Sequence, residues 1–363
     1  MSAPAQRRRT LRAEPLAPPG ADSLPDELAP RRIARRVLQA GALLAVVVLV
    51  ALLAPGLGEV RDKLAEASPG WLVLAVVFEA LSCLSYVLLF RSVFCRRLSW
   101  RTSMEIGWAE LAAGSLVPAS GAGGLALGAW ILRRGGMSLD HIARRSVAFF
   151  LIKSSVNFVA VAVIGALMAI GIVGPHKSLL LTALPAALSV MVILAVLAIP
   201  RLGPGGDPGE EASKARRTWF AVRAAVIRGT AEAVELVRSR DPLLLIGTVG
   251  YWAWDNAVLW ATYKAVGASV PISIVLMGYL IGQLGGLLPI PGGIGGIDGG
   301  LIGTLVVYGA PAAATTAAVL AYRVILFWLP LVGGAVAFVS LRRALDGSVR
   351  PDLCESRPHP QFV

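Results

Sequence analysis

Long runs of apolar residues, separated by short polar or basic stretches, dominate the pattern of this sequence. Six of these runs have about 20 residues or more, enough to cross the roughly 30 Å hydrocarbon core of a bilayer as a helix. We therefore predict an all-α polytopic membrane protein with about six full spans. The predicted spans are residues 37–57, 71–90, 146–173, 177–199, 243–263 and 312–341.

Two further apolar segments, residues 103–132 and 271–309, are each interrupted by a break rich in proline and glycine. The first break reads VPASGAGG and the second reads LLPIPGGIGG. Proline and glycine disfavour a continuous helix, and the arms on either side of each break are too short to cross a bilayer. Non-helical backbone is tolerated at membrane depth only inside protein or beside a water-filled cavity. We therefore predict two re-entrant hairpins.

Basic residues predict the orientation of these elements. Of the 34 Lys and Arg residues, 28 lie in five segments that six spans and two non-crossing hairpins place on the same side. The positive-inside rule makes that side cytoplasmic. We expect a multi-pass protein of the cell membrane with both termini in the cytoplasm, a first hairpin that opens inward and a second that opens outward. The five segments are residues 1–36, 91–102, 133–145, 201–242 and 341–363.

The same pattern divides the chain into two membrane halves, residues 37–200 and 243–341. Residues 1–36 are rich in Pro, Ala and Arg and are expected to form a disordered basic cytoplasmic tail, with a second cytoplasmic tail at residues 342–363. The linker between the halves, residues 201–242, starts with GPGGDPGEE, which disfavours regular structure.

The second part of the linker has the periodicity of an amphipathic helix. Its apolar positions recur on one face at 100° per residue. We expect this helix to lie on the inner membrane surface or to pack under the bundle. The positions are Trp219, Val222, Val226, Ala233 and Val237.

Composition supports the membrane assignment and narrows the candidate chemistry. Hydrophobic residues make up 56% of the chain, and the mean hydropathy is +0.70. The formal net charge of +12 is carried between the spans, so it sets topology, and we expect no nucleic-acid partner. The three cysteines and three histidines are scattered without the spacing of a metal site. We expect no metal and no cofactor.

The two broken segments align as an internal repeat. Each has an apolar arm, a break, and a second short arm that ends near a further glycine. Because the hairpins are predicted to open to opposite sides, the copies would be inverted, as in many secondary transporters whose breaks form the substrate site near the midplane. The alignment pairs Pro118 with Pro289, Gly121 with Gly292, Gly124 with Gly295, and Gly128 with Gly299.

The second hairpin and the span after it, LLPIPGGIGGIDGGLIGTLVVYG and AYRVILFWLPLVGG, resemble the flippase-like transmembrane family typified by the membrane half of the lysylphosphatidylglycerol synthetase/flippase. The shared pattern is P-x-P-G-G-[LI]-G-x-x-[ED], a later glycine, [YL]-R and W-L-P. The first hairpin, with Gly123-Gly124 and LRRGG, resembles the family too, and the resemblance covers residues 37–341. It implies a polytopic protein that moves an aminoacylated phospholipid between leaflets.

The sequence departs from the family pattern in two ways. The acidic position of the motif is usually Glu and here is Asp298, which keeps the charge but shortens its reach. The soluble aminoacyl-transferase domain of the bifunctional members does not follow the last span. We therefore expect a stand-alone member that does not synthesise an aminoacyl lipid.

The candidate substrate-binding residues come from both breaks and from the following span. The glycines have two interpretations: their N–H groups bind a lipid phosphate, or they allow close helix packing. Asp298 is either a site for a proton or a cationic headgroup, or a structural partner of Arg323, which in turn either binds a phosphate or neutralises Asp298. The candidates are Pro118, Gly121, Gly124, Pro289, Pro291, Gly292, Gly293, Gly295, Gly296, Asp298, Tyr322 and Arg323.

Three further charges lie inside predicted spans, namely Glu79, Lys153 and Asp255. A charge at membrane depth needs a partner, a proton or a function. These side chains either line the same cavity as the candidate site or form structural pairs.

These features favour a lipid transporter that moves an anionic, aminoacylated or polyprenyl-phosphate headgroup, with membrane lipids as its partners. No complete catalytic constellation is visible, so we do not expect an enzyme. One alternative is a membrane transferase, for which Glu79, Glu105 and Glu110 are the available acids. Another is a non-catalytic scaffold that binds a lipid-modifying enzyme through residues 201–242. The sequence does not indicate the oligomeric state.

Overall fold

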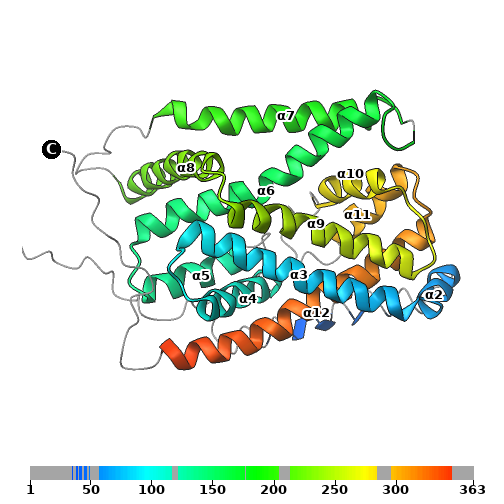
Figure 1. Ribbon diagram of the computed structural model, residues 1–363, viewed down its shortest axis with the longest axis horizontal. Helices are drawn as coiled ribbons and strands as arrows, with labels where there is room; N and C mark the ends of the chain where they lie inside the picture. Colours follow the sequence, from blue (N-terminus) through cyan, green and yellow to red (C-terminus); the bar gives the residue numbers. More distant parts are fainter. Residues whose placement is uncertain are drawn as a thin grey trace, which may run out of the picture.

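All regular structure in the described part of the chain is helical. The computed structural model describes residues 57–116, 122–175, 177–203, 213–283 and 296–345, with scattered positions between 35 and 49. Within these residues the prediction of an all-α polytopic protein is confirmed (Figure 1). The elements are α2 (Gly58–Ala65), α3 (Pro69–Phe94), α4 (Trp100–Leu116), α5 (Ala122–Arg134), α6 (Leu139–Ala169), α7 (Ala183–Ala198), the 3₁₀ helix η2 (Ile199–Leu202), α8 (Lys214–Arg238), α9 (Pro242–Ala265), α10 (Ile272–Gln283), α11 (Gly296–Val307) and α12 (Ala312–Leu345).

Four described helices are long and apolar enough to cross a membrane, and they match four of the six predicted spans. The predicted span at residues 37–57 lies almost entirely outside the described residues. The remaining predicted span is α9, which is long enough at 24 residues but less apolar, because it carries polar residues such as Asp255 and Asn256. The four apolar spans are Pro69–Phe94, Leu139–Ala169, Ala183–Leu202 and Ala312–Leu341.

Some helix ends differ from the predicted ones. The helix predicted from residue 177 begins only at Ala183, after a short segment of turns, and the last helix continues to Leu345 rather than ending at residue 341. Hydropathy does not resolve these ends, because apolar turn residues and polar helical residues can flank a span.

Helices α3 and α9 form the central pair of the bundle (Figure 1). Both begin with a proline in the first turn, where its missing N–H costs nothing. They run antiparallel, since Trp71 near the start of α3 meets Trp260 near the end of α9 with ring centroids 5.4 Å apart. At the other end, a Cβ on Gly247 would lie 2.6 Å from the backbone nitrogen of Leu89, so glycine permits the close approach.

The two broken segments form two antiparallel helical hairpins, α4 with α5 and α10 with α11. Their arms have 17, 13, 12 and 12 residues. At 1.5 Å per residue, even the longest arm spans only about 26 Å, less than the roughly 30 Å of hydrocarbon. The breaks, residues 117–121 and 284–295, lie outside the described residues.

The two hairpins begin at opposite ends of the bundle. Helix α4 follows α3 directly and α10 follows α9 directly, and α3 and α9 are antiparallel. In Figure 1, α4 and α5 accordingly lie toward one end of the molecule, and α10 and α11 lie toward the other. This arrangement is the geometry that an inverted pair requires.

At the end of the bundle where the first hairpin begins, basic side chains form ion pairs and hydrogen bonds between helices. Arg96 forms an ion pair with Asp241, which caps the first turn of α9. Arg145 at the start of α6 donates from Nη1 to the carbonyl oxygen of Val93 at 3.1 Å. The predicted basic segments 91–102 and 133–145 therefore meet at one end of the described structure. That this end is cytoplasmic remains a prediction.

The amphipathic helix of the linker is α8, which packs against α6 (Figure 1). Its predicted apolar face is half-buried at Val226 and buried at Ala233, but it is exposed at Trp219, Val222 and Val237. Packing against the bundle, one of the two predicted arrangements, therefore accounts for the part of this face between Val226 and Ala233. Helix α7 contacts α6 and leaves apolar side chains such as Met191 exposed, as expected of a helix that faces lipid.

Helix α12 is the longest element and packs on both hairpins, against α4 and against α11. A Cβ on Gly333 or on Gly334 would overlap Trp108 of α4, so both glycines are needed for this contact. Pro330 lies inside the helix, between these glycines and the part that meets α11.

Candidate functional site

The ion pair between Asp298 and Arg323 links the second hairpin to α12. Asp298 lies in the first turn of α11, where the positive end of the helix dipole favours a carboxylate. Arg323 donates from Nε to Asp298 Oδ1 at 2.6 Å, and the two side chains are 10% and 6% exposed. One of the two interpretations offered for Asp298, a structural partner for Arg323, is therefore present in the structure. A headgroup that competes for either partner would have to open this pair.

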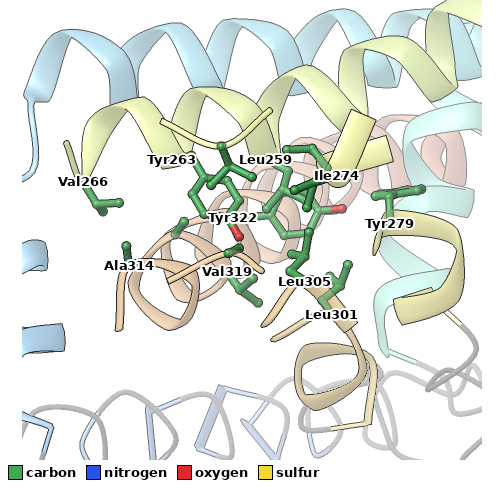
Figure 2. Packing of buried hydrophobic residues seen from close by; sticks show 14 of the residues in the cluster. Leu259, Tyr263, Val266, Ile274, Tyr279, Leu301, Leu305, Ala314, Val319 and Tyr322 are labelled. Atoms are coloured by element: carbon green, nitrogen blue, oxygen red, sulfur yellow. The ribbon is translucent and has the colours of Figure 1, made fainter. Parts of the chain in front are cut away.

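Asp255 in the middle of α9 is held by two tyrosine hydroxyls. Tyr322 donates to Oδ1 at 2.9 Å, and Tyr279 donates to Oδ2. Figure 2 shows both tyrosine rings in a buried cluster with Leu301 and Leu305 of α11. Asp255 thus joins α9, α10 and α12 next to the Asp298–Arg323 pair.

Glycines bring the arms of the second hairpin into contact. A Cβ on Gly300 of α11 would lie 2.6 Å from the carbonyl oxygen of Gly282 on α10, and a Cβ on Gly282 would lie 2.7 Å from the Cα of Leu301. Gly299 and Gly303 face open space instead. Close packing therefore explains Gly300, whereas the predicted phosphate-binding role concerns glycines that lie mostly outside the described residues.

The first hairpin has a buried carboxyl of its own, Glu110 of α4. Its Oε2 accepts a hydrogen bond from Tyr86 of α3 at 3.0 Å. The carboxyl lies against Gly128 of α5, and a Cβ on Gly124 would lie 2.5 Å from the Glu110 carbonyl oxygen. Gly124, a predicted site residue, is therefore needed for the contact between the two arms.

Lys153 of α6 lies close to this carboxyl and over three aromatic rings. Its Nζ is 5.9 Å from each of the ring centroids of Tyr86, Phe149 and Tyr251. It also interacts electrostatically with Glu110. An ammonium over aromatic faces is stabilised by the ring quadrupoles. Lys153 therefore belongs to the surroundings of the first hairpin, whereas Asp255 belongs to those of the second.

Glu79 of α3 lies near Asp255. The side chain is buried, and the Cys83 thiol donates a weak hydrogen bond to it, with Sγ 3.5 Å from Oε1. Oε2 has no hydrogen-bond partner among the described residues. Among those residues, no three His, Cys, Asp or Glu side chains converge as metal ligands.

Five of the twelve predicted substrate-binding residues fall in the described structure, namely Gly124, Gly296, Asp298, Tyr322 and Arg323. Asp298, Tyr322 and Arg323 come together with Asp255, whereas Gly124 lies in the other hairpin. The others lie outside the described residues: Pro118, Gly121, Pro289, Pro291, Gly292, Gly293 and Gly295.

Sequence reasoning missed the aromatic part of the site. Tyr86, Tyr251 and Tyr279 each contact a buried charge but carry no motif of their own. Tyr86 and Tyr251 lie in spans that also hold an acidic residue, which was the available signal, whereas the α10 arm that holds Tyr279 carries no charged residue. Glu110 was considered only as a transferase acid, although it is an intramembrane charge like Asp298.

Comparison with known proteins gives the family of this chain. The family described as the lysylphosphatidylglycerol synthase TM region matches residues 37–334. The chain belongs to this family. It is also similar to a UPF0104 membrane protein from Methanothermobacter thermautotrophicus, with 24% identity over 330 residues that cover 82% of this chain and 94% of that protein.

The lysylphosphatidylglycerol synthase TM family is a family of membrane proteins whose general assignment is a flippase-type role in lipid transport. Membership in it confirms the resemblance seen in the sequence of the second hairpin and the span after it.

Proposed function

We propose that this protein is a flippase-type lipid transporter that moves an anionic, aminoacylated or polyprenyl-phosphate headgroup across the bilayer. The observation that carries the proposal is the pair of short-armed hairpins that begin at opposite ends of the bundle, each with a buried carboxyl near its break. Glu110 lies six residues before the end of α4, and Asp298 lies in the first turn of α11. A headgroup that crosses hydrocarbon needs polar groups along its way, and broken helices supply them.

The Asp298–Arg323 pair is the proposed contact for the headgroup. A phosphate would bind the guanidinium of Arg323, and a cationic aminoacyl group would bind the carboxylate of Asp298. An aminoacylated phospholipid carries both charges, so it would replace both halves of the ion pair at once. This exchange offsets much of the free energy of separating a buried pair.

The test is lipid translocation by the purified protein in vesicles with fluorescent headgroup-labelled lipids. We expect translocation by the wild type and a loss of at least about tenfold in the double variant Asp298→Ala, Arg323→Ala, since about 1.4 kcal/mol of lost stabilisation already gives that factor. Arg238→Ala, an exposed change at the end of α8, is the matched control. Unchanged translocation in the double variant would refute the site, and no translocation by the wild type with any of the three lipid classes would refute the function.

Of the two alternatives, the transferase receives less support from the structure, whereas one feature fits the scaffold role. Of the acids that a membrane transferase would use, Glu79 and Glu110 are buried, and Glu105 is engaged by Arg101 at 3.1 Å and by Ser340 at 2.7 Å. For a scaffold role, the linker helix α8 would have to offer a free face, and its two ends, at Trp219 and Val237, are exposed. A covalent lipid product formed by the purified protein would favour the transferase.

A further inference from the structure

Glu79 and Asp255 face each other across the central pair of helices. Phe78 stacks on Trp254 with ring centroids 5.5 Å apart, so the residues that follow them, Glu79 and Asp255, lie within about 3 Å of each other along the axis of the antiparallel pair. The two carboxyl groups are close enough to interact electrostatically. They are 5% and 6% exposed. Two neighbouring carboxyls in such surroundings cannot both be ionised without a large free-energy cost.

The hydrogen bonds indicate which of the two carboxyl groups, Glu79 or Asp255, carries the negative charge. Both oxygens of Asp255 accept from tyrosine hydroxyls, of Tyr279 and Tyr322, and donors of this kind stabilise a carboxylate. Glu79 has only the thiol of Cys83, and its Oε2 has no partner among the described residues. The negative charge is therefore stabilised on Asp255 and is not stabilised on Glu79.

Among the described residues, the cations nearest to Glu79 interact with other carboxyl groups. Arg323 of α12 interacts with Asp255 and forms its ion pair with Asp298. Lys153 of α6 interacts with Glu110 of the first hairpin. Tyr251 of α9 and Cys83 of α3 are also close to both carboxyl groups, and neither brings a positive charge. An ionised Glu79 would thus be a buried carboxylate beside a second one, which is strongly unfavourable.

We propose that Glu79 is a buried proton-binding site that is protonated in this conformation, while Asp255 remains charged. The proton leaves Glu79 Oε2 for water when the surroundings of the site open, and it returns when they close, so no other reactant is needed. Resting on the proposed function, we further infer that this exchange couples lipid movement to a proton gradient. A divalent metal ion is a poor alternative, because it needs about six oxygen ligands and the described residues bring no three ligating side chains together.

The first experiment tests the site without lipid transport. Infrared difference spectra of the purified protein at neutral pH, wild type minus Glu79→Gln, should contain the carbonyl band of one protonated carboxylic acid. The matched control, wild type minus Glu66→Gln, changes an exposed residue at the end of α2 and should contain only carboxylate bands. Carboxylate bands alone in the Glu79 difference would overturn the proposal. So would a Na⁺-dependent rise in the unfolding temperature of the wild type that Glu79→Gln abolishes, because a metal cation would then occupy the site.

The second experiment tests the coupling in vesicles with a labelled lipid and an imposed pH difference. For one coupled proton, the wild-type translocation rate should change by up to about tenfold per pH unit. Glu79→Gln, whatever its own rate, should not respond to the pH difference, whereas Glu66→Gln should respond like the wild type. An equal response in the wild type and Glu79→Gln, or none in the wild type, would overturn the coupling. No translocation at all would refute the proposed function, and the infrared result would then still decide the site.

Discussion

The carboxyl group of Glu110 on α4 occupies the space that a side chain at Gly128 on α5 would fill. The same carboxyl accepts the hydrogen bond from Tyr86, so it cannot move away without losing that bond. We expect Gly128→Ala to lower the free energy of unfolding by about 1 to 3 kcal/mol, as overpacking does. The measurement is equilibrium unfolding in mixed micelles.

The control for Gly128 is Gly299, which the sequence alignment placed at the equivalent position of the second hairpin. A Cβ on Gly299 meets nothing within 4 Å, so Gly299→Ala should leave stability unchanged or raise it slightly. Equal effects of the two changes would contradict the packing described for the first hairpin.

The Asp298–Arg323 pair should behave as one unit in a double-mutant cycle. Asp298→Ala and Arg323→Ala each remove half of the buried pair, and each should cost about 3 to 5 kcal/mol. The double variant should cost clearly less than the sum, because it leaves neither charge buried alone. Additive effects in unfolding measurements would mean that the two residues are not coupled.

Gly300 and Gly303 of α11 should differ although they are one helical turn apart. A methyl group at 300 would collide with the carbonyl of Gly282 on α10, whereas a methyl group at 303 meets nothing within 4 Å. Gly300→Ala should therefore lower the unfolding temperature, and Gly303→Ala should keep or raise it, since alanine is favoured over glycine in a helix by up to about 1 kcal/mol. A stable Gly300→Ala variant would show that the arms do not pack this closely.

The contact between α8 and α6 depends on Glu232. Its carboxylate pairs with Arg144 and, at 3.1 Å, with Arg145 Nε. Glu232→Gln removes both ion pairs and should cost about 1 to 2 kcal/mol of docking free energy. Hydrogen exchange should become faster in α8 and not in α3. Glu235→Gln, an exposed change one turn away from Glu232, should leave the exchange rates as they are.

Local sequence predicted the elements of this fold better than their contacts. The apolar spans were visible because bilayer crossing requires long uninterrupted runs, and the hairpins were visible because proline and glycine break those runs. The pair of Asp298 and Arg323 was one of two open interpretations, because a lone charge in a span indicates that a partner exists but not which one. Tyr279 and Tyr322 can both donate to Asp255 only because α9, α10 and α12 meet there. The spacing of residues along a single helix does not indicate such a contact.

The exposed ends of α8 are a second case in which the sequence predicts a helix but not its contacts. Periodicity places Trp219, Val222 and Val237 on one face with Ala233, but it could not indicate how much of that face another helix covers. The length of the contact with α6 is a property of the tertiary structure. For the same reason, the register of α3 on α9, and with it the position of Glu79 opposite Asp255, could not be predicted.

Pro330 makes one turn of α12 easier to bend than the rest of the helix. Proline lacks the N–H that would bond to the carbonyl of Leu326, so the helix is weakest against bending at this turn. Arg323 before it holds the second hairpin, and Gly333 and Gly334 after it hold the first. A change in the bend of α12 would therefore alter the distance between the hairpins while both contacts stay intact. Such a change would link the positions of the two hairpins through one shared helix.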